Sequence, residues 1–141
     1  MSDELKELEK NFILDEDAQK ESIKELIRET LTFCKIDKGG YVVLENPSRK
    51  FTIVNKIMLV LSARYLANRL QASLGNEPSI KESVNVQELS DVLKVKQAVI
   101  RARLKDLKDK KNVVPTSSGT YRVAAYAIGP FLKSVGGKNE S

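Results

Sequence analysis

The stretch from Val84 to Ala125 limits the possible folds of this chain most strongly, because its hydrophobic pattern changes repeatedly over a short distance. A short helical segment containing ELSDVL is followed by a tight turn at KVK and then by a basic helical run, QAVIRARLKDLKDKK. The sequence VVPTSSGTYRVAA has the pattern of two strands joined by a turn. The predicted order is therefore helix, turn, helix and hairpin.

Helical periodicity divides the second helix of this stretch into two faces. The buried face consists of three aliphatic residues at spacings of four and three: Ile100, Leu104 and Leu107. The opposite face centres on Ala98, Ala102 and Lys105 and is bordered by Arg101. Small side chains at the middle of an exposed face let a helix approach the floor of the DNA major groove, and neighbouring basic side chains can then reach bases or phosphates.

Positive charge is concentrated in the same region. Between Lys94 and Lys111 there are eight Lys/Arg and two acidic residues, a net charge of +6. Residues 1–34 hold five Lys/Arg and ten Asp/Glu, a net charge of −5, whereas residues 35–141 hold 19 and nine, a net charge of +10. A charged helical face can simply be solvated, but the adjacent hairpin favours contact with a polyanion, and we expect nucleic acid.

Two helices are expected in the acidic N-terminal part. Residues 2–12 carry Leu5, Leu8 and Phe12 at helical spacing, and Asp15 or Asp17 can cap the next helix. That next helix has one apolar stripe: Ile23, Leu26, Ile27, Leu31 and Cys34. The stripe is expected either to pack on the rest of the chain or to form a dimer interface. A third alternative is an acidic arm that occupies the DNA surface when DNA is absent.

The middle of the chain predicts a turn, a strand and a long core helix. Asp37 to Gly40 forms the turn, and Gly39 and Gly40 lack the Lys-Ser/Thr signature of a phosphate loop. Residues 41–44 are strand formers, and Thr52 is a good N-cap for a helix through about Ser73. Six residues are expected on the inward face of this helix: Ile53, Ile57, Met58, Leu61, Leu66 and Leu70.

The hairpin and the C-terminal segment carry further local signals. Asn112 is suited to a left-handed conformation at the end of the basic helix, and Pro115 restricts its strand to the edge of a sheet. We expect strands at 113–116 and 120–125, with Tyr121 pointing inward. Residues 126–135 contain a Gly129-Pro130 break and then apolar residues that pack on the long helix or on a second subunit.

The stretch VNVQELSDVLKVKQAVIRARLKDLKDKKNVVPTSSGTYRV resembles the winged helix-turn-helix superfamily, including MarR-like and ArsR-like regulators. The resemblance extends further toward the N-terminus if Thr52 to Leu70 is the first helix of that module. The strand at 41–44 before the long helix is also similar to small archaeal winged-helix proteins. The resemblance implies a mainly α fold with a small β-hairpin and, here, extra N-terminal helices. In this superfamily the second helix reads the major groove, and the hairpin touches the DNA backbone or the minor groove.

Carried over position by position, the resemblance places helix 96–111 in the major groove and the hairpin at 113–125 beside it. It implies that Lys96, Gln97, Arg101 and Lys105 read the groove, with Ser118 and Arg122 in the hairpin. We expect four further DNA-binding residues beside them: Lys94, Lys110, Lys111 and Ser117. The sequence departs from the family pattern at two glycine positions, which are Lys94 in the turn and Lys111 before the hairpin. The exposed face also has Ala98 and Ala102 in place of the usual Ser/Thr pair, which offers fewer side-chain hydrogen bonds to bases.

We therefore expect an acidic helical arm at 1–38, a winged helix-turn-helix domain at 39–135 and a disordered tail at 136–141. The expected function is that of a DNA-binding transcriptional regulator, a homodimer on double-stranded DNA. The alternative is a winged-helix protein-protein interaction module or a subunit of a larger nucleic-acid-processing assembly.

The amino-acid composition excludes several kinds of functional site. The chain has no His and a single Cys, Cys34, which excludes a disulfide within the chain and the common zinc sites. No catalytic constellation is found, so we predict no enzyme activity, no cofactor, no metal and no small-molecule ligand. The densest apolar run, Ile57 to Leu61, is far shorter than the roughly 20 residues of a membrane helix, and the N-terminus lacks an apolar signal segment. We expect a cytoplasmic, nucleoid-associated protein.

Overall fold

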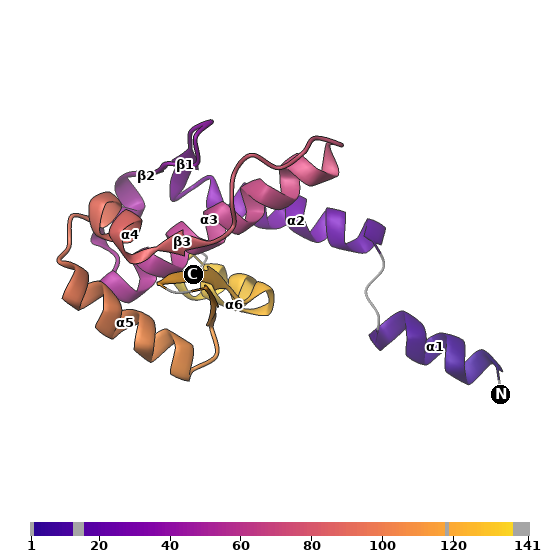
Figure 1. Cartoon of the computed structure of the whole chain (residues 1–141). Coiled ribbons are helices and arrows are strands. Elements are labelled where there is room, and N and C mark those ends of the chain that lie inside the picture. The colour runs from indigo at the N-terminus through magenta and orange to yellow at the C-terminus, as the bar shows by residue number, and fades with distance from the viewer. Residues whose placement is uncertain (1, 13–15, 118, 137–141) are drawn as a thin grey trace.

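The computed structural model describes residues 2–12, 16–117 and 119–136 (Figure 1). It has six α-helices and one 3-10 helix within these residues: α1 (Ser2–Phe12), α2 (Glu16–Thr30), η1 (Asn46–Lys50), α3 (Ile53–Ser73), α4 (Val86–Leu93), α5 (Gln97–Asp109) and α6 (Ala125–Gly136). The strands are β1 (Cys34–Ile36), β2 (Val42–Leu44), β3 (Val84–Asn85), β4 (Val113–Ser117) and β5 (Thr120–Val123). The expected class, mainly α with small β elements, is confirmed.

Helix α3 forms the centre of the molecule, and α2, α4, α5, α6, β1, β2 and β5 pack against it (Figure 1). Its predicted limits are confirmed, because Thr52 Oγ1 accepts a hydrogen bond from the Asn55 N–H at 3.2 Å. Every residue from 57 to 64 is buried, so this part of the helix contacts neighbours on all sides. The prediction for Leu70 is wrong, because the end of α3 extends past the core and leaves this side chain 42% exposed.

Helix α2 packs against α3 and α6 of its own chain. Its side chains Ile23, Leu26 and Ile27 are partly buried against the core, so the structure has the first of the three arrangements considered for the apolar stripe. The proposed cap Asp15 and the side chain of Phe12 lie outside the described part of the chain. Helix α1 stands apart from the other elements in Figure 1.

A β-hairpin that the sequence did not predict follows α2. Strand β1 pairs antiparallel with β2, with Cys34 opposite Leu44. Cys34 is therefore in a strand and not on the α2 stripe, and Leu31, which follows the end of α2, is 52% exposed instead of buried. The turn prediction is confirmed, because Asp37 Oδ1 accepts the N–H groups of Gly39 and Tyr41, each at 2.9 Å. The expected domain boundary at residue 38 falls inside this hairpin.

The second sheet has the strand order β3-β5-β4. Strand β4 lies at the edge, as Pro115 requires, and Val84 of β3 faces Tyr121 of β5. Val123 is fully buried and Tyr121 is packed partly buried against the core. The inward orientation predicted for Tyr121 is consistent with this packing.

Two predictions near the C-terminus are wrong. The left-handed residue after α5 is Lys111, with φ 64°, and not Asn112, because Lys111 directly follows the last turn of the helix. Helix α6 also continues through Gly129-Pro130 instead of breaking there. Buried side chains on both sides of the proline, Ile128 and Phe131, hold the segment against the core as one helix. Of the expected tail, only Gly136 lies within the described residues.

Candidate nucleic-acid interface

The turn between α4 and α5 is built by local hydrogen bonds. Asn85 caps α4, with its Oδ1 accepting the Glu88 N–H at 2.7 Å. The helix ends at Lys94, which is left-handed with φ 57° and ψ 47°. The Val95 N–H then donates to the Ser90 carbonyl at 3.2 Å, and the Ser90 hydroxyl donates to the Val95 carbonyl at 2.6 Å. These bonds hold a lysine in a conformation that usually belongs to glycine.

Helix α5 has the two faces that periodicity predicts. Three residues are buried at its inner face: Ile100, Leu104 and Leu107. Ala98, Arg101, Ala102 and Lys105 are all exposed on the other side. Val99 is also 38% exposed, which the sequence reasoning missed although its position beside Ala98 on the helix could have indicated it. An exposed valine here offers an apolar contact of the kind that the thymine methyl group accepts.

A chain of side-chain hydrogen bonds crosses from α4 to α5. Gln87 Nε2 donates to Asp91 Oδ1 at 2.9 Å, and Gln97 Nε2 donates to Gln87 Oε1 at 2.6 Å. Arg101 Nη2 then donates to Gln97 Oε1 at 3.0 Å. The structure thus brings together two predicted site residues, Gln97 and Arg101, and adds Gln87. Gln87 was missed because the contact joins two helices whose packing the sequence does not specify.

The five predicted lysines are all exposed: Lys94, Lys96, Lys105, Lys110 and Lys111. Lys111 also fixes the end of α5, because its carbonyl accepts a hydrogen bond from the Tyr126 hydroxyl of α6. The Asn112 N–H donates to the Leu107 carbonyl at 2.9 Å and closes the last helical turn. Arg103 is half-buried and pairs with Asp106 at 3.3 Å, so it is less available than its neighbours.

The described side chains of the hairpin are less available for contact with DNA than expected. The Ser117 side chain is exposed, but its Oγ lies 2.8 Å from Thr120 Oγ1, and its N–H donates to the same oxygen at 3.1 Å. Ser118 lies outside the described residues. Arg122 is half-buried, with Nη1 donating to the Val123 carbonyl at 3.4 Å. The geometry therefore favours α5 and its two ends over the hairpin as the candidate nucleic-acid interface.

No protein-family model, no curated protein and no solved structure matches this chain. Within residues 2–12, 16–117 and 119–136, no group of three or more Cys, Asp or Glu side chains could hold a metal ion. None of the helices in those ranges is both long and apolar enough to cross a lipid bilayer.

Proposed function

We propose that this chain is a DNA-binding protein of the winged helix-turn-helix type, with α5 as the helix that enters the major groove. The order of elements from α3 to β5 supports this, because a helix-turn-helix is followed directly by a hairpin. The strand order β3-β5-β4 adds support, since it joins the hairpin to the strand that precedes α4 and so fixes its position beside the helix pair.

The observation that carries the proposal is the solvent face of α5. The face centres on Ala98, Ala102 and Lys105; the two alanines keep its middle low, and Arg101 stands at its border. A groove about 12 Å wide admits a helix with such a face. In this arrangement Arg101 reaches a guanine edge through two hydrogen bonds, and Gln97 reaches an adenine edge.

The hydrogen-bond chain from Asp91 to Arg101 supports a role in base reading rather than in charge attraction alone. Gln87 holds Gln97 at 2.6 Å, and Gln97 holds Arg101 at 3.0 Å. Side chains that are already oriented lose less conformational entropy on binding. The lysines at the two ends of α5 then supply contacts with phosphates, which position the protein on the duplex but carry no sequence information.

A transcriptional regulator is the biological role that best suits this surface, acting in the cytoplasm at the nucleoid. If the protein is a homodimer, its two copies of α5 would contact half-sites one helical turn apart. The recognised sequence would then be close to a palindrome.

Selection of bound sequences from a random duplex pool tests the proposal. The wild-type protein is expected to enrich one motif. Arg101→Ala should relax the preference at one base pair, at a cost of about 1 to 3 kcal/mol, because it removes a contact with a base edge. Lys110→Ala is the matched control. It should weaken binding to all sequences alike, because it removes a contact with a phosphate.

Two outcomes would count against the proposal. Equal effects of both substitutions on every sequence would indicate non-specific binding. No enrichment at all, together with a stable protein partner, would favour a winged-helix interaction module instead.

A further inference from the structure

The hydrogen-bond chain that joins α4 to α5 has a fixed polarity at both of its ends. Asp91 on α4 ends the chain as a carboxylate, which only accepts hydrogen bonds, and it accepts from Gln87 Nε2 at 2.9 Å. Arg101 on α5 ends it as a guanidinium, which only donates, and it donates to Gln97 Oε1 at 3.0 Å. The amides of Gln87 and Gln97 lie between these two ends.

The two ends determine which way each amide faces. A glutamine amide can exchange the places of its oxygen and nitrogen by a flip about its last side-chain bond. Because Asp91 needs a donor, Gln87 turns its nitrogen toward the carboxylate and its oxygen toward Gln97. Gln97 therefore donates from Nε2, at 2.6 Å, and keeps its oxygen for Arg101. A flip of either amide would place two donors or two acceptors together, so the chain of bonds admits one orientation of Gln97.

This orientation leaves Gln97 with the pair of groups that matches adenine. Its amide has two N–H donors and an oxygen with two lone pairs, so one donor and one lone pair remain after the contacts with Gln87 and Arg101. In the major groove, adenine offers the acceptor N7 beside the donor N6, and one glutamine amide can bind both. Gln97 is partly exposed and is the first residue of α5, at the end of the helix that contacts base edges in helix-turn-helix proteins.

We propose that Gln87 is a positioning residue for base recognition, which holds the Gln97 amide in the orientation that reads adenine. This inference rests on the proposed DNA-binding function of α5 and specifies the bases that it recognises. Gln97 and Arg101 lie one helical turn apart, about 6 Å along the axis, and successive base pairs are about 3.4 Å apart. The preferred sequence should therefore contain adenine within about two base pairs of the guanine that Arg101 contacts.

Gln87→Met tests the positioning role, because methionine has nearly the same length and makes neither hydrogen bond. The Gln97 amide is then held on one side only, and only the fraction with the correct orientation binds adenine. Ordering this side chain at the interface should lower the preference for adenine at that position about threefold to tenfold. The preference for guanine at the Arg101 position should change little. Gln87 is exposed, so the substitution leaves the core intact.

A swapped pair provides the rescue variant. Gln87→Glu combined with Asp91→Asn exchanges the amide and the carboxylate between the two positions and keeps their summed charge. The carboxylate at position 87 accepts from Gln97 as the native amide does, and the amide at position 91 supplies the donor. We expect this double variant to keep the adenine preference of the wild type. A preference is a ratio of affinities for two bases, so a uniform change in charge attraction cancels.

Two measurements are made on the wild type, Gln87→Met and the swapped pair. In the free proteins, NMR relaxation of the Gln97 side-chain amide should report an ordered group in the wild type and the swapped pair, and a mobile group in Gln87→Met. On DNA, the adenine position is located as the base pair of the selected motif that Gln97→Ala relaxes. Binding constants for duplexes that differ only at this base pair then give the preference of each protein.

Equal mobility of the Gln97 amide in the wild type and in Gln87→Met would overturn the positioning role. The same holds if Gln87→Met leaves the adenine preference unchanged, or if the base pair that Gln97→Ala relaxes is not adenine-thymine. These three results leave the proposed DNA-binding function standing. A wild type that enriches no motif would overturn both the proposed function and this inference.

Discussion

Arg64 is a charged residue in the middle of the buried part of α3, and its side chain forms four hydrogen bonds. The guanidinium donates to the carbonyls of Lys81, Ser83 and Gly40 and to Glu88 Oε2, the last at 2.8 Å. Buried cations persist in proteins when their hydrogen bonds are satisfied in this way. Arg64 therefore holds α3, the turn before β2, the segment before β3 and the start of α4 in one arrangement.

Arg64→Met should lower the free energy of unfolding by about 3 kcal/mol, because it leaves buried carbonyl groups without a donor. Glu88→Gln removes only the negative charge that pairs with Arg64. Because the Glu88 side chain is 45% exposed, this substitution should lower the free energy of unfolding by less than about 1 kcal/mol. Urea denaturation of the two variants beside the wild type measures the difference. Similar losses in both would show that the ion pair, and not the hydrogen bonds to the backbone, provides the stabilisation.

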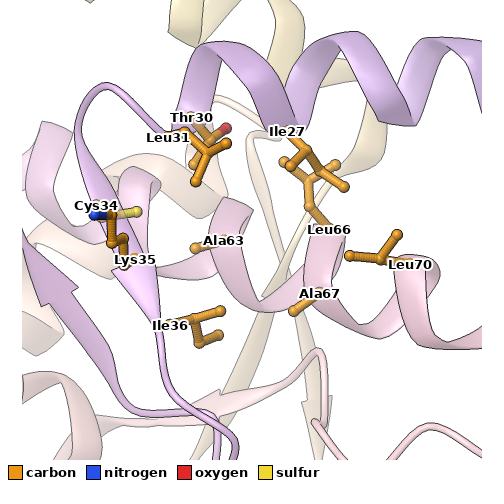
Figure 2. A pocket seen from close by; sticks show the side chains of 10 residues that line it. All are labelled: Ile27, Thr30, Leu31, Cys34, Lys35, Ile36, Ala63, Leu66, Ala67 and Leu70. Atoms are coloured by element: carbon orange, nitrogen blue, oxygen red, sulfur yellow. The ribbon is translucent and has the colours of Figure 1, made fainter.

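Cys34 is a second buried residue whose side chain affects stability, through the pKa of its thiol. It lies among apolar side chains that line a hollow between α2, β1 and α3 (Figure 2). Burial, with a smaller contribution from the Glu45 carboxylate, raises the pKa of its thiol from an ordinary 9.0 to about 12. The unfolded chain therefore loses this proton first as the pH rises. The neutral thiol contributes its full stability below pH 9, and this contribution is lost between pH 9 and about 12.

The wild type should consequently lose about 1 kcal/mol more unfolding free energy between pH 8 and pH 10 than a Cys34→Ala variant does. Comparing the two proteins removes every effect of pH that they share. The measurement is urea denaturation at a series of pH values. Parallel curves for the two proteins would mean that the thiol titrates normally in the folded chain.

At the scale of elements, α4 and α5 end in the same way. Lys94 and Lys111 are the two described non-glycine residues with positive φ, at 57° and 64°. A left-handed conformation costs an L-residue roughly 1 to 2 kcal/mol, and glycine avoids most of this cost. Both lysines border the face that we propose for DNA, so each position combines backbone strain with a positive charge at the site.

Lys94→Gly and Lys111→Gly should each stabilise the fold by about 1 kcal/mol and weaken DNA binding, because each relieves strain and removes a charge. Lys108→Gly removes the same charge inside α5 and should instead destabilise the fold by about 1 kcal/mol. Thermal unfolding and DNA affinity are measured on the same three variants. If the first two weaken folding as Lys108→Gly does, the strain argument is wrong.

Several elements could be predicted because their signals are local. The Thr52 cap set the start of α3, and the spacing of Ile100, Leu104 and Leu107 identified the buried face of α5. Features that depend on long-range packing could not be predicted. Strand β1 has only three residues and follows directly on an apolar helical stripe, and α6 runs through Pro130 because core contacts on both sides outweigh the local break.

The candidate site was predictable to a similar extent. Helical periodicity correctly predicted that Arg101 and Lys105 are exposed. The contact of Gln87 with Gln97 could not be predicted, because it joins residues ten positions apart and depends on the angle between two helices. The burial of Arg64 also depends on backbone carbonyls from two other segments, the turn before β2 and the segment before β3. A sequence pattern carries no signal for either arrangement.

At the scale of the whole molecule, the charges are separated in space as well as in sequence. Helix α5 lies along one side of the molecule, and the acidic helix α1 lies at the opposite end (Figure 1). Such a distribution orients the molecule in the field of a polyanion, with the basic side approaching first. The net charge of +5 therefore understates the positive charge that is concentrated on the α5 surface.

The salt dependence of binding to duplex DNA tests the central claim most directly. If α5 and its flanking lysines neutralise about four phosphates, the logarithm of the binding constant should fall with the logarithm of salt concentration at a slope near −3.6. Lys96→Ala should reduce the magnitude of this slope by about 1. Fluorescence anisotropy of a labelled duplex provides the measurement. A flat response for the wild type, or no binding at low salt, would contradict the account of α5 as a DNA-binding helix.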